Sequence, residues 1–156
     1  MATRGFEFAY MLDGSQAVPV VRDFVLGQAA AHKVGDLMLI QSDGYADQVA
    51  GSIDEVTGVM MEALAAADVT AGTTKGKIAI ITRNQVWRCS TDASTAATAL
   101  LGTVKTWDTV DCNTIDADDV TNGSMTVAED VDTVNLDDDG YVIGYVVFSD
   151  TTFGNA

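Results

Sequence analysis

The residues best suited to bind a metal lie in one acidic stretch near the C-terminus, NLDDDGYVIGYVVF, which begins at Asn135. Aligned on a calcium-binding loop, Asn135, Asp137 and Asp139 take the first, third and fifth ligand positions. Gly140 then falls on the required glycine, but the bidentate Glu expected at the twelfth position is Val146. The flanking residues predict strands rather than helices. A tight turn between two strands explains the stretch more simply, because Asp and Gly supply the hydrogen bonds and positive φ of a hairpin.

Other motifs that could carry chemistry are incomplete. The segment 72–77 is similar to a phosphate-binding loop, but it is one residue short and leads into a predicted strand instead of a helix. His32 is the only histidine, and nothing near it in the sequence suggests a catalytic triad. Acid pairs such as Asp118-Asp119 could serve glycoside hydrolysis, yet 23 acidic residues produce such pairs by chance. The sequence therefore predicts a protein that is not an enzyme and has no cofactor.

The charge of the chain is spread unevenly. Residues 1–105 hold 11 acids and 8 bases, whereas residues 106–156 hold 12 acids and neither Lys nor Arg. Such a C-terminal half repels phosphates, so nucleic-acid binding is not expected. Two interpretations stay open: a solvated face that keeps the protein dispersed, or a surface that docks on a basic partner.

The length and the apolar content predict one folded domain. The chain has 156 residues, of which 47% are hydrophobic, enough for a core despite the net charge of −15. No apolar run approaches the ~20 residues that a membrane span needs, and the first 16 residues lack the apolar segment of a secretory signal. Cys89 and Cys112 are too few for a disulfide framework and are expected to be reduced thiols in the cytoplasm.

Strand patterns dominate the chain. Short apolar runs alternate with polar turns, which predicts a mainly β protein, expected as a small β-barrel or β-tulip-like domain with one or two short helices. Residues 53–67 have the composition of a helix but also suit a buried strand, and both possibilities stay open. Residues 94–101 predict a short capped helix. The expected strands lie within residues 34–41, 77–82, 86–89, 131–136 and 141–148.

The first 17 residues predict an extended N-terminal arm ahead of a single β-rich domain over 18–156, with a possible internal division near 68–76. Phe6, Phe8 and Tyr10 alternate as the side chains of a strand do. A free arm would expose these aromatic rings, so it is expected to pack either on its own core or on another chain.

Three short motifs follow one another in the first half of the chain: Val34-Gly35-Asp36, Asp43-Gly44 and Gly58-Val59-Met60. The C-terminal half adds the runs TIDADDVTNGS and GYVIGYVVF. Together with the residues around them, these motifs resemble the small head-decoration (cement) proteins of tailed bacteriophages, over most of residues 18–150. The motifs are short and also occur in other small β proteins.

The resemblance implies a structural virion protein, assembled in the host cytoplasm and placed on the outside of the capsid. It implies the major capsid protein as partner, with the chain itself forming a trimer or dimer there, and neither nucleic acid nor membrane as a partner. If the arm makes the contact, the expected capsid-binding residues are Arg4, Phe6, Phe8 and Tyr10. Such an arm could add as a strand to the edge of a capsid sheet.

Two other classes of function stay open. A calcium-dependent acidic β-domain used for adhesion or surface binding would explain the DDDG turn, although the ligand set is incomplete. A small hydrolase that uses scattered acids and hydroxyls is the third. A calcium-dependent melting temperature would favour the adhesion domain, and a pocket with a strongly shifted carboxylate would favour the hydrolase.

Overall fold

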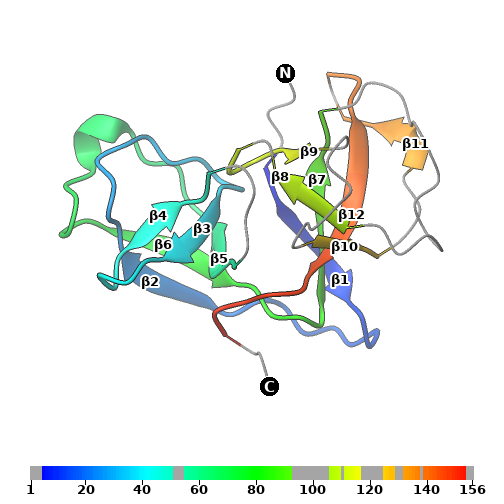
Figure 1. Ribbon diagram of the computed structural model, residues 1–156, viewed down its shortest axis with the longest axis horizontal. Helices are drawn as coiled ribbons and strands as arrows, with labels where there is room; N and C mark the ends of the chain where they lie inside the picture. Colours follow the sequence, from blue (N-terminus) through cyan, green and yellow to red (C-terminus); the bar gives the residue numbers. More distant parts are fainter. Residues whose placement is uncertain are drawn as a thin grey trace.

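The protein consists of two antiparallel β-sheets, which lie on opposite sides of the view in Figure 1. The structure is a computed structural model, and it describes residues 5–50, 55–92, 106–109, 111–116, 125–128, 132–137 and 139–153. The prediction of a mainly β protein is confirmed. The sheets are not closed into the expected barrel, because only isolated bridges, Leu26–Ala46 in one sheet and Thr91–Ile115 in the other, join their end strands back to the same sheet. No described helix is long and apolar enough to cross a membrane.

The strands divide between the sheets mainly by their order along the chain. The seven-stranded sheet has the order β1-β7-β12-β10-β8-β9, with β11 also paired to β12, and the five-stranded sheet has the order β2-β6-β5-β3-β4. The first sheet contains β1 (Glu7–Met11), β7 (Gln85–Ser90), β8 (Thr106–Thr109), β9 (Ile115–Asp116), β10 (Met125–Val127), β11 (Asp132–Leu136) and β12 (Val142–Phe148). The second contains β2 (Val21–Val25), β3 (Leu37–Ile40), β4 (Ala46–Gln48), β5 (Gly58–Met60) and β6 (Lys75–Ile80).

The main core joins the two sheets. It includes Leu37, Val59 and Ala79 from the five-stranded sheet, and Trp87 and Phe148 from the seven-stranded sheet. A division of the chain near residues 68–76 would separate β5 from β6, which pair with each other. One continuous apolar core therefore holds both sheets together.

The inner strands of the five-stranded sheet, β3, β5 and the end of β6, are buried on both faces, whereas β2 at its edge is largely exposed. Val59 and Ala79 point into the main core, whereas their neighbours Met60 and Ile78 point into a second, smaller core on the opposite face. The smaller core also contains Leu26. Because successive side chains of a strand point to opposite faces, burial of both faces requires apolar residues at every position. This explains the uninterrupted apolar runs of β3 and of the end of β6.

Residues 55–67 are the described part of the segment that suited either a helix or a strand. They contain β5, and a short 3-10 helix, η1 (Ala66–Asp68), begins at their end. Of the two alternatives the buried strand is correct there. Gly58 is required in this strand because a Cβ atom at that position would lie 2.2 Å from the carbonyl oxygen of Ala79. The helix predicted over residues 94–101 lies outside the described residues.

Candidate docking surface

The N-terminal segment expected to contact a partner is an edge strand of the protein's own sheet. Strand β1 pairs with β7, and the Glu7 carboxylate accepts a hydrogen bond of 2.6 Å from the Arg88 guanidinium across that pair. Hydrogen bonding to Glu7 raises the pKa of Arg88, so the guanidinium stays charged. Residues 7–11 therefore belong to the protein's own fold. Of the two alternatives left open by the sequence, packing on its own core or on another chain, the first is the one observed for this strand.

The four residues predicted to bind a capsid have different surroundings. Phe6 is only 2% exposed and its ring lies 5.7 Å from that of Phe148, so it has no surface to offer a partner. Phe8 is half-buried, and its ring meets Trp87 edge-on. Tyr10 is 40% exposed. Arg4 lies outside the described residues, so among the other three Tyr10 presents the most surface.

The acidic stretch near the C-terminus forms the predicted hairpin between β11 and β12. The Asp137 Oδ1 atom accepts hydrogen bonds from the backbone N–H groups of Asp139 and Tyr141, both at 2.9 Å. The other oxygen, Oδ2, accepts one of 2.5 Å from the Ser90 hydroxyl. Gly140 has a φ of 86°, as the turn requires.

Asp137 is buried, whereas Asp139 in the same turn is exposed. Its carboxylate oxygens serve the turn and the neighbouring strand, which leaves them poorly placed as open metal ligands. Among the described residues, no group of three or more His, Cys, Asp or Glu side chains could hold a metal ion.

Three groups inside the described part of the protein have notable surroundings. Burial, together with the nearby Asp36 and Asp111 carboxylates, raises the pKa of the Cys112 thiol to about 12, so at neutral pH it is protonated and weakly nucleophilic. His32 is buried, and neither ring nitrogen has a hydrogen-bond partner among the described residues. Burial, aided by Asp43, also raises the pKa of the Asp47 carboxyl. None of these three groups lines the groove described below.

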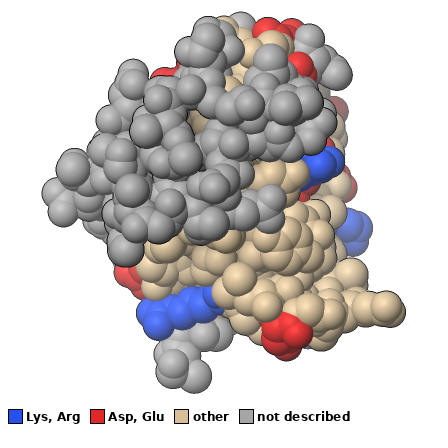
Figure 2. Space-filling view, turned by 90° about the vertical axis from the view of Figure 1, so that its right-hand side faces the viewer, with Lys and Arg blue, Asp and Glu red and all other residues tan. Residues whose placement is uncertain are grey.

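On the face turned toward the viewer in Figure 2, the described residues form no large charged patch. Figure 2 shows that the described surface on this side is mainly uncharged, with isolated acidic and basic side chains. The described part of this face therefore offers no broad acidic surface to a basic partner.

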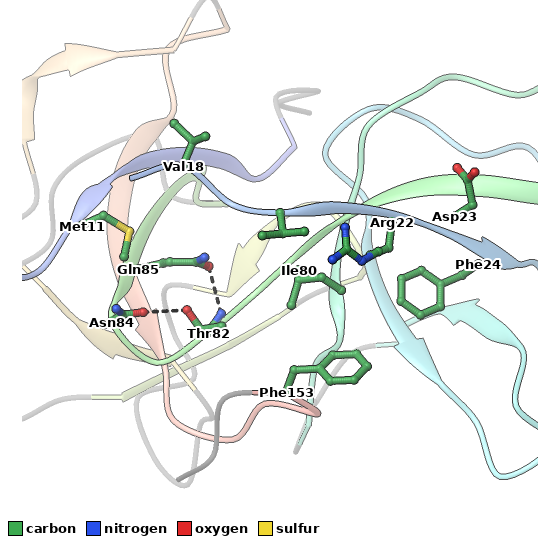
Figure 3. A pocket seen from close by; sticks show the side chains of 11 residues that line it. Met11, Val18, Arg22, Asp23, Phe24, Ile80, Thr82, Asn84, Gln85 and Phe153 are labelled. Atoms are coloured by element: carbon green, nitrogen blue, oxygen red, sulfur yellow. Dashed lines mark hydrogen bonds between the residues drawn. The ribbon is translucent and has the colours of Figure 1, made fainter. Parts of the chain in front are cut away.

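The described residues form an apolar groove beside β2, at the junction of the two sheets (Figure 3). It has a volume of about 600 Å³. It is lined by apolar side chains from β1, the β1–β2 connection, β2, β6 and the C-terminal segment. Polar side chains at the turn between β6 and β7 and two charged side chains on β2 complete the lining. The apolar residues are Met11, Val18, Val20, Phe24, Ile80 and Phe153, and the polar ones are Arg22, Asp23, Thr82, Asn84 and Gln85.

The apolar walls of this groove are open to solvent. Val18 is 72% exposed, Val20 is 51% exposed and Phe153 is 42% exposed. Phe153 lies across the groove from Ile80 and close to Phe24, with ring centroids 6.5 Å apart. A contiguous exposed apolar surface on a strongly charged protein is the usual mark of a binding site.

The sequence interpretation missed this groove because its residues come from four distant parts of the chain. One local signal was available. The run Val18-Pro19-Val20-Val21 is apolar at every position, yet all of its valines are exposed in the structure. Such a run normally predicts a buried strand. That its valines are exposed can be seen only in the three-dimensional structure.

The residues that carry the sequence resemblance have structural roles. Gly35 lies against the backbone of Gly5, and the Asp36 carboxylate accepts hydrogen bonds from the Lys33 N–H group and the Gln48 side chain. Gly44 has a φ of 85° in the turn after β3. These motifs therefore describe how the five-stranded sheet is built and do not mark a binding site.

Comparison with known proteins does not extend the resemblance: no protein-family model matches this chain, and no curated protein matches it.

Proposed function

We propose that this chain is a structural protein of a tailed-bacteriophage head, which binds the outside of the expanded capsid and holds neighbouring major capsid subunits together. The observation that carries the proposal is the exposed apolar groove beside β2, lined by Val20, Phe24 and Phe153 among others. The resemblance to head-decoration proteins supports the choice of partner. The placement of Phe6 in the core moves the proposed contact from the N-terminal arm to this groove.

The proposed mechanism is linkage between binding and assembly. A protein that binds only the expanded lattice stabilises that lattice by about 2.7 kcal/mol per site when its free concentration is 100 times Kd. Interfaces of about 1,000–1,600 Å² are sufficient when they are repeated over a whole shell. Copies that associate as trimers or dimers on the capsid would add avidity. Neither nucleic acid nor membrane has a part in this mechanism, and the net charge of −15 opposes binding to phosphate backbones.

A charge placed in the groove tests the proposal. Val20→Asp is expected to weaken binding to expanded heads about tenfold or more, because a carboxylate would be buried against apolar side chains. The measurement is co-sedimentation of the purified variant with expanded heads that lack the chain, with unexpanded heads in parallel. Val20 is half exposed in the free protein, so folding should be little affected.

Met61→Asp is the matched control, because Met61 is 45% exposed and does not line the groove. It should bind expanded heads as the unmodified chain does. Equal binding by both variants would remove the groove from the interface. Failure of the unmodified chain to sediment with expanded heads would overturn the proposed function.

A further inference from the structure

The outer edge of β2 has main-chain groups directed away from its own sheet. The Val20 carbonyl accepts a hydrogen bond from Ile80, and the Leu26 N–H group donates one to the Thr74 carbonyl, both at 2.8 Å. Hydrogen-bonded positions alternate along a strand of an antiparallel pair, so residues 20, 22, 24 and 26 bond to β6. The N–H and C=O groups of Val21 and Asp23 and the N–H group of Val25 therefore point outward, whereas the Val25 carbonyl faces Ala46 of β4, which forms a parallel bridge with Leu26.

The first part of this edge, from Val21 to Asp23, is open to another strand. No described strand pairs with it, and the bridge between Leu26 and Ala46 of β4 lies just beyond the end of β2. One of its outward carbonyls, that of Val21, accepts a long bond of 3.4 Å from the Arg22 guanidinium, which a backbone N–H group could replace. Exposed edge strands are usually protected from pairing with another chain by Pro or by charged side chains that point inward. Pro19 lies before the strand, and the Asp23 carboxylate is already paired with Lys77 at 3.2 Å.

The groove lies on one face of the same strand. Val20, Arg22 and Phe24 alternate along β2 and line the groove together. The Arg22 side chain makes no ion pair with a described residue, whereas Asp23 is neutralised by Lys77. A segment laid along the edge would therefore meet two apolar positions separated by one available positive charge.

We propose that an extended segment of a partner chain adds to the outer edge of β2 as a further strand, with apolar side chains in the groove and a carboxylate opposite Arg22. This inference rests on the proposed function, in which the segment belongs to a major capsid subunit. Main-chain hydrogen bonds supply affinity in such a complex, and alternate side chains supply specificity.

Charge argues against a second copy of this chain as the occupant. Antiparallel pairing of β2 with its own copy, centred on any of residues 21–23, would place Arg22 opposite or diagonal to the same arginine of the other copy. A different chain, with a carboxylate at this position, removes this penalty.

A titration with synthetic peptides tests the inference without a capsid. The probe is acetyl-Thr-Val-Thr-Glu-Thr-Val-Thr-amide, which carries Val, Glu and Val on one face, and its partner has Lys in place of Glu. The expected result is a saturable shift of the Val21, Asp23 and Val25 amide resonances of the ¹⁵N-labelled protein at about millimolar peptide. The Glu peptide should bind about threefold more tightly than the Lys peptide, the usual effect of one exposed ion pair.

Arg22→Glu should reverse the preference between the two peptides, and N-methylation of the Glu peptide at alternate residues should abolish its binding. The inference is wrong if no saturable shift occurs at about 5 mM peptide, if the shifts lie away from β2, or if Glu and Lys peptides bind equally. Because the titration contains no capsid, such a failure leaves the proposed function intact when the protein still sediments with expanded heads. If the peptide binds but the protein does not sediment with expanded heads, the proposed function is wrong and the addition of a strand to β2 is supported.

Discussion

Replacing Phe6 by alanine is expected to lower the free energy of unfolding by about 3–5 kcal/mol, the usual cost of removing a buried aromatic side chain. Phe6 is almost fully buried, and its ring packs on Phe148 at 5.7 Å in the core between the two sheets. Few rearrangements could fill the resulting cavity, because Phe6 precedes a strand that is fixed to β7. Urea denaturation followed by tryptophan fluorescence measures the loss.

Tyr10→Ala is the matched control, since Tyr10 belongs to the same strand and its side chain is 40% exposed. It should cost less than about 1 kcal/mol. Equal effects of the two substitutions would contradict the assignment of Phe6 to the core. The same result also explains why deletion of the N-terminal arm is a poor test of capsid binding: the deletion would remove an edge strand and a core residue together.

Replacing Gly35 by alanine is the second change with a large expected effect, a loss of about 3–5 kcal/mol in the free energy of unfolding. Gly35 has a φ of 98°, which L-residues rarely adopt. A Cβ atom there would lie 2.5 Å from the Cα atom of Gly5, and that neighbour is backbone, which cannot rotate away. The Gly35 carbonyl also accepts a hydrogen bond of 2.9 Å from the Phe6 N–H group. The substitution would therefore separate the N-terminal segment from the five-stranded sheet.

Gly44→Ala separates the two causes of this loss. Gly44 also has a positive φ, of 85°, but a Cβ atom there would meet nothing within 4 Å. Only backbone strain remains, so the expected cost is about 1–2 kcal/mol. Thermal unfolding followed by circular dichroism compares the variants. If Gly35→Ala were no more harmful than Gly44→Ala, the close contact between the two backbones would not exist in solution.

The strands were predicted well wherever local chemistry determines them. Each of the apolar runs expected as a strand contains one, and the hairpin at the DDDG turn forms because Asp137 and Gly140 supply what a turn needs within a few residues. Val146, which takes the twelfth position of the calcium-loop alignment, is a buried strand residue, as the expected strand requires. Such features depend on neighbours in sequence and can be recognised there.

What could not be predicted depends on distant parts of the chain. The alternation of Phe6 and Phe8 indicates a strand, but only the pairing of β1 with β7 shows that the strand belongs to the protein's own sheet. The sequence of the Met- and Ala-rich segment before η1 was compatible with a helix. Because β5 is buried on both faces, its apolar and polar residues do not alternate, and alternation is the pattern by which a strand is normally recognised. The groove beside β2 is formed by residues as far apart as Met11 and Phe153.

The most direct test of the proposed function is the melting temperature of expanded heads, measured by scanning calorimetry with and without the purified chain. If the chain cements capsid subunits, the melting temperature of the heads should rise by several degrees and reach a plateau when the sites are saturated, because the ligand binds only the assembled lattice. Binding with no change in the melting temperature, or no binding at all, would contradict a stabilising role on the capsid.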